Sequence, residues 1–359
     1  MTMYKRILSL LPIGGLVAVL GLSSCKSDTT EPSAVPGYTV TNLVASNSSY
    51  SGARVDQKLI NAWGMAVSGG GNFWISAADG NVSTVYDGTG AEKLSAVTIP
   101  SRDSVAGGNP TGQVYNPVPG NFKGALFIFV TEDGTVASWK STNGGAAERA
   151  ATSATDQASY KGCALADDGG TTYLYVADFK GRKIDVYDRN FDPVLGKSFS
   201  DPTMPLEYSP FNIVNIGGKL YIAYAKRDNP PNDDEEVKGD GNGYVSVFNP
   251  DGSFVSRFAS QGTLNAPWGI AQAPSTFGTY QNAILVGNFG DGRISAFNAT
   301  SGAYIGQLKG TDSKEVSIDG LWGLAFSSAG SNDGSLLYFT AGPNDENDGL
   351  FGYVKFITP

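Results

Sequence analysis

Six short segments of the chain place polar or aromatic side chains directly before an apolar, strand-like stretch. They are NAWG from Asn61, NPTG from Asn109, YKG from Tyr160, SPFN from Ser209, NAPWG from Asn265 and DGLWG from Asp319. Five of them supply an Asn or Asp side chain, at Asn61, Asn109, Asn212, Asn265 and Asp319. Carboxamide and carboxylate oxygens suit Ca²⁺, so these five residues predict a calcium or polar-ligand site. The alternative is that Asn and Asp before Gly or Pro only form turns.

Aromatic residues accompany these polar side chains. Trp63, Trp268 and Trp322 each precede the glycine that opens the apolar stretch, and we expect Tyr160 and Phe211 at comparable positions. Rings at such positions could stack on a sugar or an aromatic ligand. They could equally be large residues that pack one repeat against the next. The first interpretation makes all five residues candidates for ligand contact.

Acidic loops form the third group of candidate residues. The longest runs from Lys226 to Gly243 (KRDNPPNDDEEVKGDGNG) and carries Asp233, Asp234, Glu235, Glu236 and Asp240. It lacks the bidentate glutamate of an EF-hand, so it is either a solvated flap or a lid that binds a cation or a ligand. For proton transfer at a metal-bound water, the candidate carboxylates are Asp319, Asp133 and Glu132.

The chain of 359 residues has no histidine, which restricts the chemistry. Histidine general bases, Ser-His-Asp and Cys-His nucleophile systems and histidine-ligated zinc are all excluded. Two cysteines are present, Cys25 and Cys163, and Cys163 in the run GCALA is expected to be a buried apolar residue. The net charge of −9 disfavours nucleic acid as a partner.

A repeated pattern of short strands indicates how these residues are positioned. Aligned on the residue that opens the first strand, the copies begin at Gly64, Gly112, Gly162, Asn212, Gly269 and Gly323, which are 48 to 57 residues apart. Repeats of this length with about four strands each are typical of propeller blades, so we expect an all-β, six-bladed β-propeller. The last repeat shows only three strands. We expect the strand from Tyr38 to Ser46 to complete that blade and close the ring.

The N-terminal region predicts export. Lys5 and Arg6 precede an apolar run that ends in LSSC, which is typical of a signal peptide over residues 1–24. LSSC resembles the lipobox of bacterial lipoproteins, which implies that Cys25 is lipidated. An ordinary signal peptide with an incidental cysteine is the alternative. Residues 25–37 are polar and proline-bearing and are expected to be a flexible tether before a propeller over residues 38–359. By the same resemblance, Lys26 favours the outer membrane of a bacterial envelope.

Several motifs carry a resemblance to known families. APWGIA at Ala266 and LYVADFKGRKIDVYD at Leu174 resemble the blades of NHL-repeat propellers. A second resemblance, to an uncharacterised family of exported bacterial propellers, is carried by FVTEDGTVASW at Phe129, LNAPWGIA at Leu264, LVGNFGDGRISAF at Leu285, and IDGLWGLAF with LYFTAGP from Ile318 to Pro343. Some members of that family carry a PEP-CTERM sorting signal. The predicted ring of Asn and Asp also resembles the calcium site of lactonase-type propellers. The resemblance implies a fold but no established activity.

Two functions of different classes follow from this sequence. The favoured one is a lipid-anchored module of the envelope that binds a protein, a glycan or a small molecule at the channel mouth, most simply as a monomer. The alternative is a calcium-dependent hydrolase or lactonase at the same mouth, in which Ca²⁺ polarises a carbonyl and activates water. A purely structural envelope protein is compatible with the composition, but no residue points to it.

Overall fold

The computed structural model describes residues 35–155, 157–228 and 234–358. This part of the chain folds into 24 β-strands and three short 3-10 helices, Asn121–Gly124, Ser141–Asn143 and Gly278–Tyr280. No helix within these ranges is long and apolar enough to cross a membrane. The predicted signal peptide, Cys25, the first ten residues of the tether and Asp233 lie outside the described residues.

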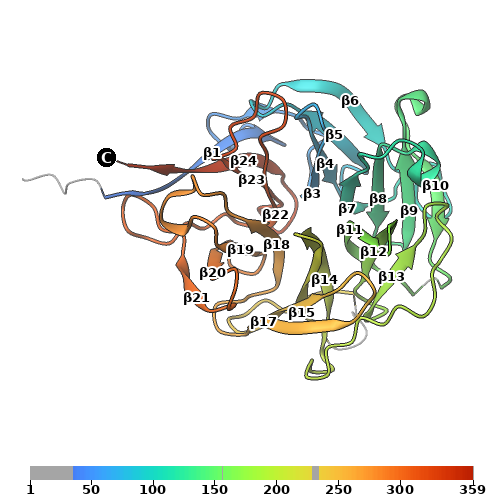
Figure 1. Ribbon diagram of the computed structural model, residues 1–359. Coiled ribbons are helices and arrows are strands. Elements are labelled where there is room, and N and C mark those ends of the chain that lie inside the picture. Colours follow the sequence, from blue (N-terminus) through green and yellow to red (C-terminus); the bar gives the residue numbers. More distant parts are fainter. Residues whose placement is uncertain (1–34, 156, 229–233, 359) are drawn as a thin grey trace, which may run out of the picture. The chain divides into compact units, whose positions relative to one another are not determined.

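The strands form six sheets arranged as the blades of a β-propeller, which confirms the predicted fold (Figure 1). Blades 1 and 2 contain β3 (Ala62–Val67), β4 (Phe73–Ala77), β5 (Val82–Tyr86), β6 (Glu92–Thr98), β7 (Pro110–Tyr115), β8 (Phe127–Thr131), β9 (Thr135–Trp139) and β10 (Glu148–Thr152). Blades 3 and 4 contain β11 (Tyr160–Asp168), β12 (Thr171–Asp178), β13 (Lys183–Tyr187), β14 (Tyr208–Ile216), β15 (Lys219–Lys226), β16 (Gly243–Phe248) and β17 (Phe254–Ser260). Blades 5 and 6 contain β18 (Pro267–Gln272), β19 (Ile284–Asn288), β20 (Ile294–Phe297), β21 (Tyr304–Gln307), β22 (Leu321–Phe326), β23 (Leu337–Ala341) and β24 (Leu350–Ile357).

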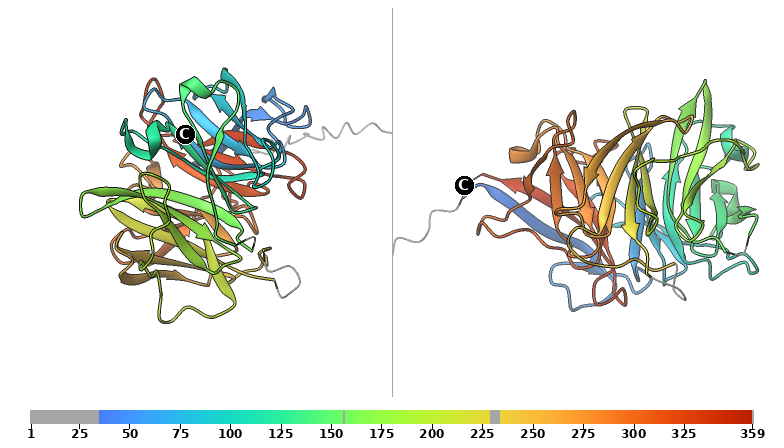
Figure 2. Two further views of the ribbon diagram at one scale, coloured as in Figure 1. Left: turned by 90° about the vertical axis from the view of Figure 1, so that its right-hand side faces the viewer. Right: turned by 90° about the horizontal axis from the view of Figure 1, so that it is seen from below.

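The N-terminal strand closes the ring as predicted. β1 (Gly37–Ala45) pairs antiparallel with β24, and the short β2 (Arg54–Val55) adds to its outer edge in parallel. The blue N-terminal strand therefore runs beside the red C-terminal strand (Figures 1 and 2). Without the pairing of β1 with β24, each of these two strands would leave an open sheet edge.

Blade 3 differs from the expected four strands, because only β11, β12 and β13 pair in its sheet. After β13 the chain makes a single bridge from Tyr187 to Pro193 and then leaves the blade. The next residues contain Pro202 and Pro205, which cannot donate to a strand ladder. Asp201 instead accepts hydrogen bonds from Ser246 and Arg257 of blade 4, so this segment connects two blades rather than completing one.

Glycines open five of the six innermost strands, β3, β7, β11, β18 and β22, and Asn212 opens β14; the glycines let neighbouring strands approach closely around the channel (Figure 1). A Cβ on Gly64 would lie 2.3 Å from the carbonyl oxygen of Thr111, and one on Gly269 would lie 2.5 Å from that of Trp322. Contacts this short are not tolerated, so the repeated glycine that guided the sequence alignment has a steric cause.

The apolar core follows the same sixfold plan. Six core clusters of the described chain lie each between two neighbouring blades. Between blades 1 and 2, for example, the ring of Trp74 stacks on Phe127 at 3.9 Å. A seventh cluster takes residues from five of the blades, and it contains the three predicted tryptophans. This central cluster positions the candidate site.

Candidate functional site at the channel mouth

Aromatic residues close the channel where the innermost strands begin. The ring of Trp322 is fully buried and stacks on both Trp63 and Phe289 with ring centroids 3.9 Å apart. Trp268 and Phe211 meet Trp322 edge-on at 6.1 and 5.8 Å. We call this group, the residues Trp63, Phe179, Phe211, Trp268, Phe289 and Trp322, the aromatic plug.

The plug bears on the two interpretations of the tryptophans. Trp63, Trp268 and Trp322 are 3%, 5% and 0% exposed, so their rings pack against one another in this structure. Packing of this kind stabilises the ring of blades from its centre, because stacked and edge-on aromatic pairs add to the burial of apolar area. Direct stacking of a ligand on these rings stays a prediction.

A lysine takes the place that we expected for Tyr160. Lys161, not Tyr160, directly precedes the opening glycine of blade 3, as Trp63 does in blade 1. Tyr160 lies in the core between blades 2 and 3, where its hydroxyl contacts Asp185 and Tyr187 at 2.8 Å. Lys161 is only 2% exposed, and its Nζ lies 5.0 Å from the centre of the Trp63 ring. A comparison of the single residue that precedes each of the six opening positions would have identified Lys161.

Carboxylates from several blades surround Lys161. Glu132, in the β8–β9 turn, forms an ion pair with it. Glu236, Glu235 and Glu346 are close enough to interact with it electrostatically, and Asp79 interacts with Glu132. These turns all join the second and third strands of a blade, so they lie on the same face as the loops that lead into the innermost strands. We call Asp79, Glu132, Glu235, Glu236 and Glu346 the carboxylate cluster.

Asn61 connects this cluster to the aromatic plug. Its Oδ1 accepts a hydrogen bond from the indole N–H of Trp322 at 3.0 Å, and its Nδ2 donates to Glu346 at 2.6 Å. Asn61 is 3% exposed, and its backbone adopts a left-handed conformation with φ 49°. Asn tolerates this conformation better than most residues. Of the five predicted Asn and Asp residues, Asn61 is therefore the one that contacts the carboxylate cluster.

Three of the five carboxylates have raised pKa values. The pKa of Glu236 is about 7, because burial and, to a lesser degree, the neighbouring carboxylates Glu346 and Glu235 raise it and Lys161 only partly opposes them. Burial also raises the pKa values of Glu346 and Asp79, although both accept hydrogen bonds from Asn61. For Lys161, burial favours the neutral amine, but attraction by Glu132 and Glu236 outweighs it and raises the pKa. Perturbed groups gathered in this way are typical of functional sites.

The other four predicted Asn and Asp residues form hydrogen bonds with other loops and blades. The backbone N–H of Asn109 donates to Asn81, and Asn212 donates from Nδ2 to the carbonyl of Trp268 at 2.8 Å. Asn265 accepts from the N–H of Gly239 at 2.7 Å, and Asp319 from the N–H of Asn344 at 3.0 Å. These four bonds join residues 25 to 56 positions apart in the sequence, so they link separate loops and blades and are not the local turn bonds of the turn interpretation.

The remaining predicted carboxylates lie in different surroundings. Both oxygens of Asp133 are engaged, by Thr131 and Thr135 and by the N–H of Arg102. Asp234 lies 4.0 Å from Lys180, and Asp240 is exposed. No group of three or more His, Cys, Asp or Glu residues in the described ranges is arranged to hold a metal ion. Calcium binding by the Asn and Asp ring stays a prediction.

Fold and site together define a class: a six-bladed β-propeller with a closed channel and a carboxylate cluster over its aromatic plug. The chain is 37% identical over 332 residues to uncharacterized protein R648 of Acanthamoeba polyphaga mimivirus, which covers 87% of this chain and 79% of that protein. Uncharacterized protein L690 of the same virus is 37% identical over 329 residues, with 87% and 84% covered. The chain therefore belongs to the family of these uncharacterized mimivirus proteins.

Solved structures agree on the fold. Virginiamycin B lyase from Staphylococcus aureus superposes with a TM-score of 0.53 at 13% identity and covers 89% of this chain and 100% of that one. A protein of unknown function from Bacteroides thetaiotaomicron gives 0.57 at 13% identity, covering 89% and 76%. Penicillium chrysogenum α-L-arabinanase gives 0.56 at 13% identity, covering 89% and 98%. Identities this low show the fold alone.

No protein-family profile matches the chain. The relatives found by sequence are viral, so the expected family of exported bacterial proteins is not confirmed. The β-propeller part of that expectation is confirmed by the solved structures.

Proposed function

We propose that this protein is a binding module whose channel mouth holds a cationic group of its ligand. The observation that carries the proposal is the carboxylate cluster. Five acidic side chains share the mouth with the single buried ammonium of Lys161. Three of the five, Asp79, Glu236 and Glu346, have raised pKa values. Nearby positive charge and hydrogen bonds therefore do not fully offset the cost of burying their ionised forms.

A cationic group of a ligand would supply the missing positive charge. An ammonium or guanidinium group near Glu236 and Glu346 favours their ionised forms, so binding releases protons around pH 7. The surrounding rings also suit a cation, because the ring faces of Trp and Phe attract positive charge. The chain already uses this contact, since Nζ of Lys238 lies 4.3 Å from the centre of the Phe289 ring.

Calorimetric titration with L-argininamide and with spermidine tests the proposal. We expect saturable binding that weakens at least tenfold in Glu346→Gln and in Glu132→Gln, because each variant removes a carboxylate beside the ligand. Glu148→Gln is the matched control, since Glu148 is exposed on the outer strand β10. Absence of binding by either probe, or equal affinity in all three variants, would contradict the proposal.

Calcium titration in the same series addresses the alternative hydrolase. Binding that Asn265→Ala and Asp319→Ala abolish would move the site to the predicted Asn and Asp ring, and a screen of lactones and phosphoesters would follow. Displacement of calcium by L-argininamide, with loss of both in Glu346→Gln, would instead place both cations at the carboxylate cluster.

We also propose, from residues 1–37 of the sequence, that the module is exported and anchored to a bacterial membrane through a lipid on Cys25. The support is the basic start, the short apolar run and the LSSC sequence. A tether of about a dozen residues would let the mouth reach ligands away from the membrane surface.

A further inference from the structure

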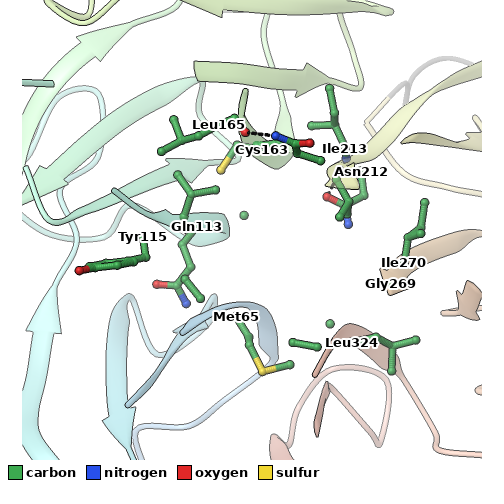
Figure 3. Close-up of a pocket in the computed structure, with 18 of the residues that line it drawn as sticks. Met65, Gln113, Tyr115, Cys163, Leu165, Asn212, Ile213, Gly269, Ile270 and Leu324 are labelled. Atoms are coloured by element: carbon green, nitrogen blue, oxygen red, sulfur yellow. Dashed lines mark hydrogen bonds between the residues drawn. The ribbon is translucent and has the colours of Figure 1, made fainter. Parts of the chain in front are cut away.

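The channel between the innermost strands contains a hollow of 520 Å³, but the apolar residues around it belong to the cores between blades (Figure 3). Ile213 packs between blades 3 and 4, Ile270 between blades 4 and 5, and Leu324 between blades 5 and 6. Side chains that already fill these cores do not present an apolar wall to a ligand in the channel.

A larger hollow, of 650 Å³, lies at the outer edge of blade 3, where the fourth strand is missing. β13 is the outermost strand of this sheet (Figure 1). All five residues of β13 line the hollow, and the other lining residues are 193–200, Thr152, Ala154 and Arg182. Its volume is sufficient for a short stretch of polypeptide.

The chain begins a fourth strand in blade 3 and then abandons it. The N–H of Val194 donates to the carbonyl of Val186 at 2.8 Å, as a fourth strand would. At Gly196 the backbone turns with φ 91°, a conformation that favours glycine. Lys197 then leads to blade 4, where its Nζ donates to the carbonyl of Pro250 at 3.2 Å. The fourth position is therefore filled beside one end of β13 and hollow beside the other.

The vacant position leaves the backbone of Ile184 unpaired. Outward-pointing residues alternate along an antiparallel strand, so Ile184 directs its N–H and C=O away from β12, as Val186 does. Neither group has a hydrogen-bond partner in the described ranges. In blade 5 the corresponding residue is Ile294, and its carbonyl accepts from the N–H of Leu308 at 3.0 Å, directly after the fourth strand β21. An unpaired edge of this kind is a template for another strand.

Cationic side chains surround the vacant position, although the whole chain carries a net charge of −9. Arg182, Lys183 and Lys197 line the hollow, and among its described lining residues Asp185 alone is acidic. Lys183 and Lys197 have carboxylate partners, whereas Arg182 is exposed and has no ion-pair partner in the described part of the chain. Leu195, which is 91% exposed at the same hollow, offers an apolar contact.

We propose that an extended, acidic segment of a partner protein binds at this edge and completes blade 3 as its fourth strand. The segment runs antiparallel to β13, exchanges backbone hydrogen bonds with Ile184, places an acidic side chain beside Arg182 and covers Leu195. The side chain of Ile184 stays in the core between blades 3 and 4, so the contact uses its backbone. This site is independent of the cationic ligand site, because it lies at the outer edge of one blade and not at the channel mouth.

Fluorescence anisotropy with a labelled, end-blocked peptide of sequence EVTVE tests the proposal on the full chain. We expect saturable binding, together with slower hydrogen exchange at the N–H of Ile184. The same peptide with N-methyl groups on its three central residues keeps the charges but cannot donate to the edge, and it should bind about fivefold more weakly or worse. The peptide KVTVK should also bind more weakly, because it brings like charges to Arg182.

Two pairs of variants locate the site. Arg182→Glu should weaken EVTVE binding by about 3- to 10-fold. Arg293→Glu is its matched control, because Arg293 is exposed in the corresponding turn of blade 5, whose fourth strand is present. Leu195→Ser should weaken binding as well, whereas Leu206→Ser, at a residue that is 75% exposed outside the hollow, should not. Circular dichroism checks that each variant is folded.

Several results would overturn the proposal. It is wrong if wild type does not bind EVTVE, if the N-methylated peptide binds equally well, or if bound peptide leaves hydrogen exchange at Ile184 unchanged. Protection of Ile184 that rises with protein concentration in the absence of peptide would assign the edge to a second copy of this chain instead. Equal binding of EVTVE and KVTVK would contradict the acidic character of the partner.

Discussion

At the scale of single residues, the position of Lys161 determines the balance of charge at the channel mouth. Five of the residues before the opening positions are uncharged (Trp63, Thr111, Phe211, Trp268 and Trp322), and Lys161 is the only charged one. A lysine that is 2% exposed requires a counter-charge, and Glu132 supplies it. The other carboxylates of the cluster exceed this need. Burial, with neighbouring carboxylates, raises the pKa values of Asp79, Glu236 and Glu346, so the mouth suits a further cation.

Glu236 makes stability depend on pH. Its pKa is about 7 in the folded protein and near 4.5 in a solvated chain, so the unfolded state ionises first as the pH rises. The folded state therefore loses stability between about pH 4.5 and 7, and below that window the penalty disappears. Glu236→Gln removes the penalty, and we expect it to be more stable than wild type by about 1–3 kcal/mol at pH 8 and by little at pH 4.5.

Urea unfolding of Glu236→Gln at both pH values measures this difference. Glu148→Gln serves as the control, because Glu148 is exposed and its variant should follow wild type at each pH. A stability difference between Glu236→Gln and wild type that does not change with pH would show that the carboxyl of Glu236 is not perturbed.

At the scale of strands and blades, the sequence was most informative where steric and pairing rules repeat. The opening glycines predicted the innermost strands, because Gly64, Gly112, Gly162, Gly269 and Gly323 stand where neighbouring backbones nearly touch. The three-stranded sheet of blade 3 was not predicted, because the segment after Tyr187 is fixed by contacts to blade 4 rather than by its own sequence pattern. The carboxylate cluster was not predicted for a similar reason, because it brings together turns that are far apart in the sequence.

β1 is the element on which closure of the ring depends, and Tyr38 fastens it to blade 5. The hydroxyl of Tyr38 donates to the carbonyl of Phe277 at 3.0 Å, and its ring packs 4.9 Å from that of Phe277. We expect Tyr38→Phe to cost about 1 kcal/mol for the hydrogen bond. Tyr38→Ala should cost about 3–5 kcal/mol, because it also leaves a cavity between β1 and blade 5.

Chemical denaturation of these variants gives the two costs. Tyr304→Ala is the control, since Tyr304 is 51% exposed on β21 and its loss should stay within about 0.5 kcal/mol. Equal costs for Tyr38→Ala and Tyr304→Ala would mean that β1 adds little to the stability of the ring.

At the scale of the whole molecule, the aromatic plug joins five blades at the centre of the ring. Its rings come from blades 1, 3, 4, 5 and 6. Trp322 stacks on Trp63 and Phe289 and donates its indole N–H to Asn61, which in turn donates to Glu346 of the carboxylate cluster. The rings that pack these blades together therefore also position the carboxylate cluster.

The N-terminal region sets where such a module would operate, and Cys25 is its decisive residue. Expressed in a bacterial host that processes lipoproteins, the full chain should incorporate a fatty-acid label and sediment with membranes. Cys25→Ser should lose both properties, while the propeller keeps its melting temperature, because β1 begins only at Gly37. Cys163→Ser is the matched control and should keep the label, since Cys163 is buried within the propeller. Labelling of Cys25→Ser, or a soluble wild type, would leave the propeller intact as a binding module but without the proposed anchor.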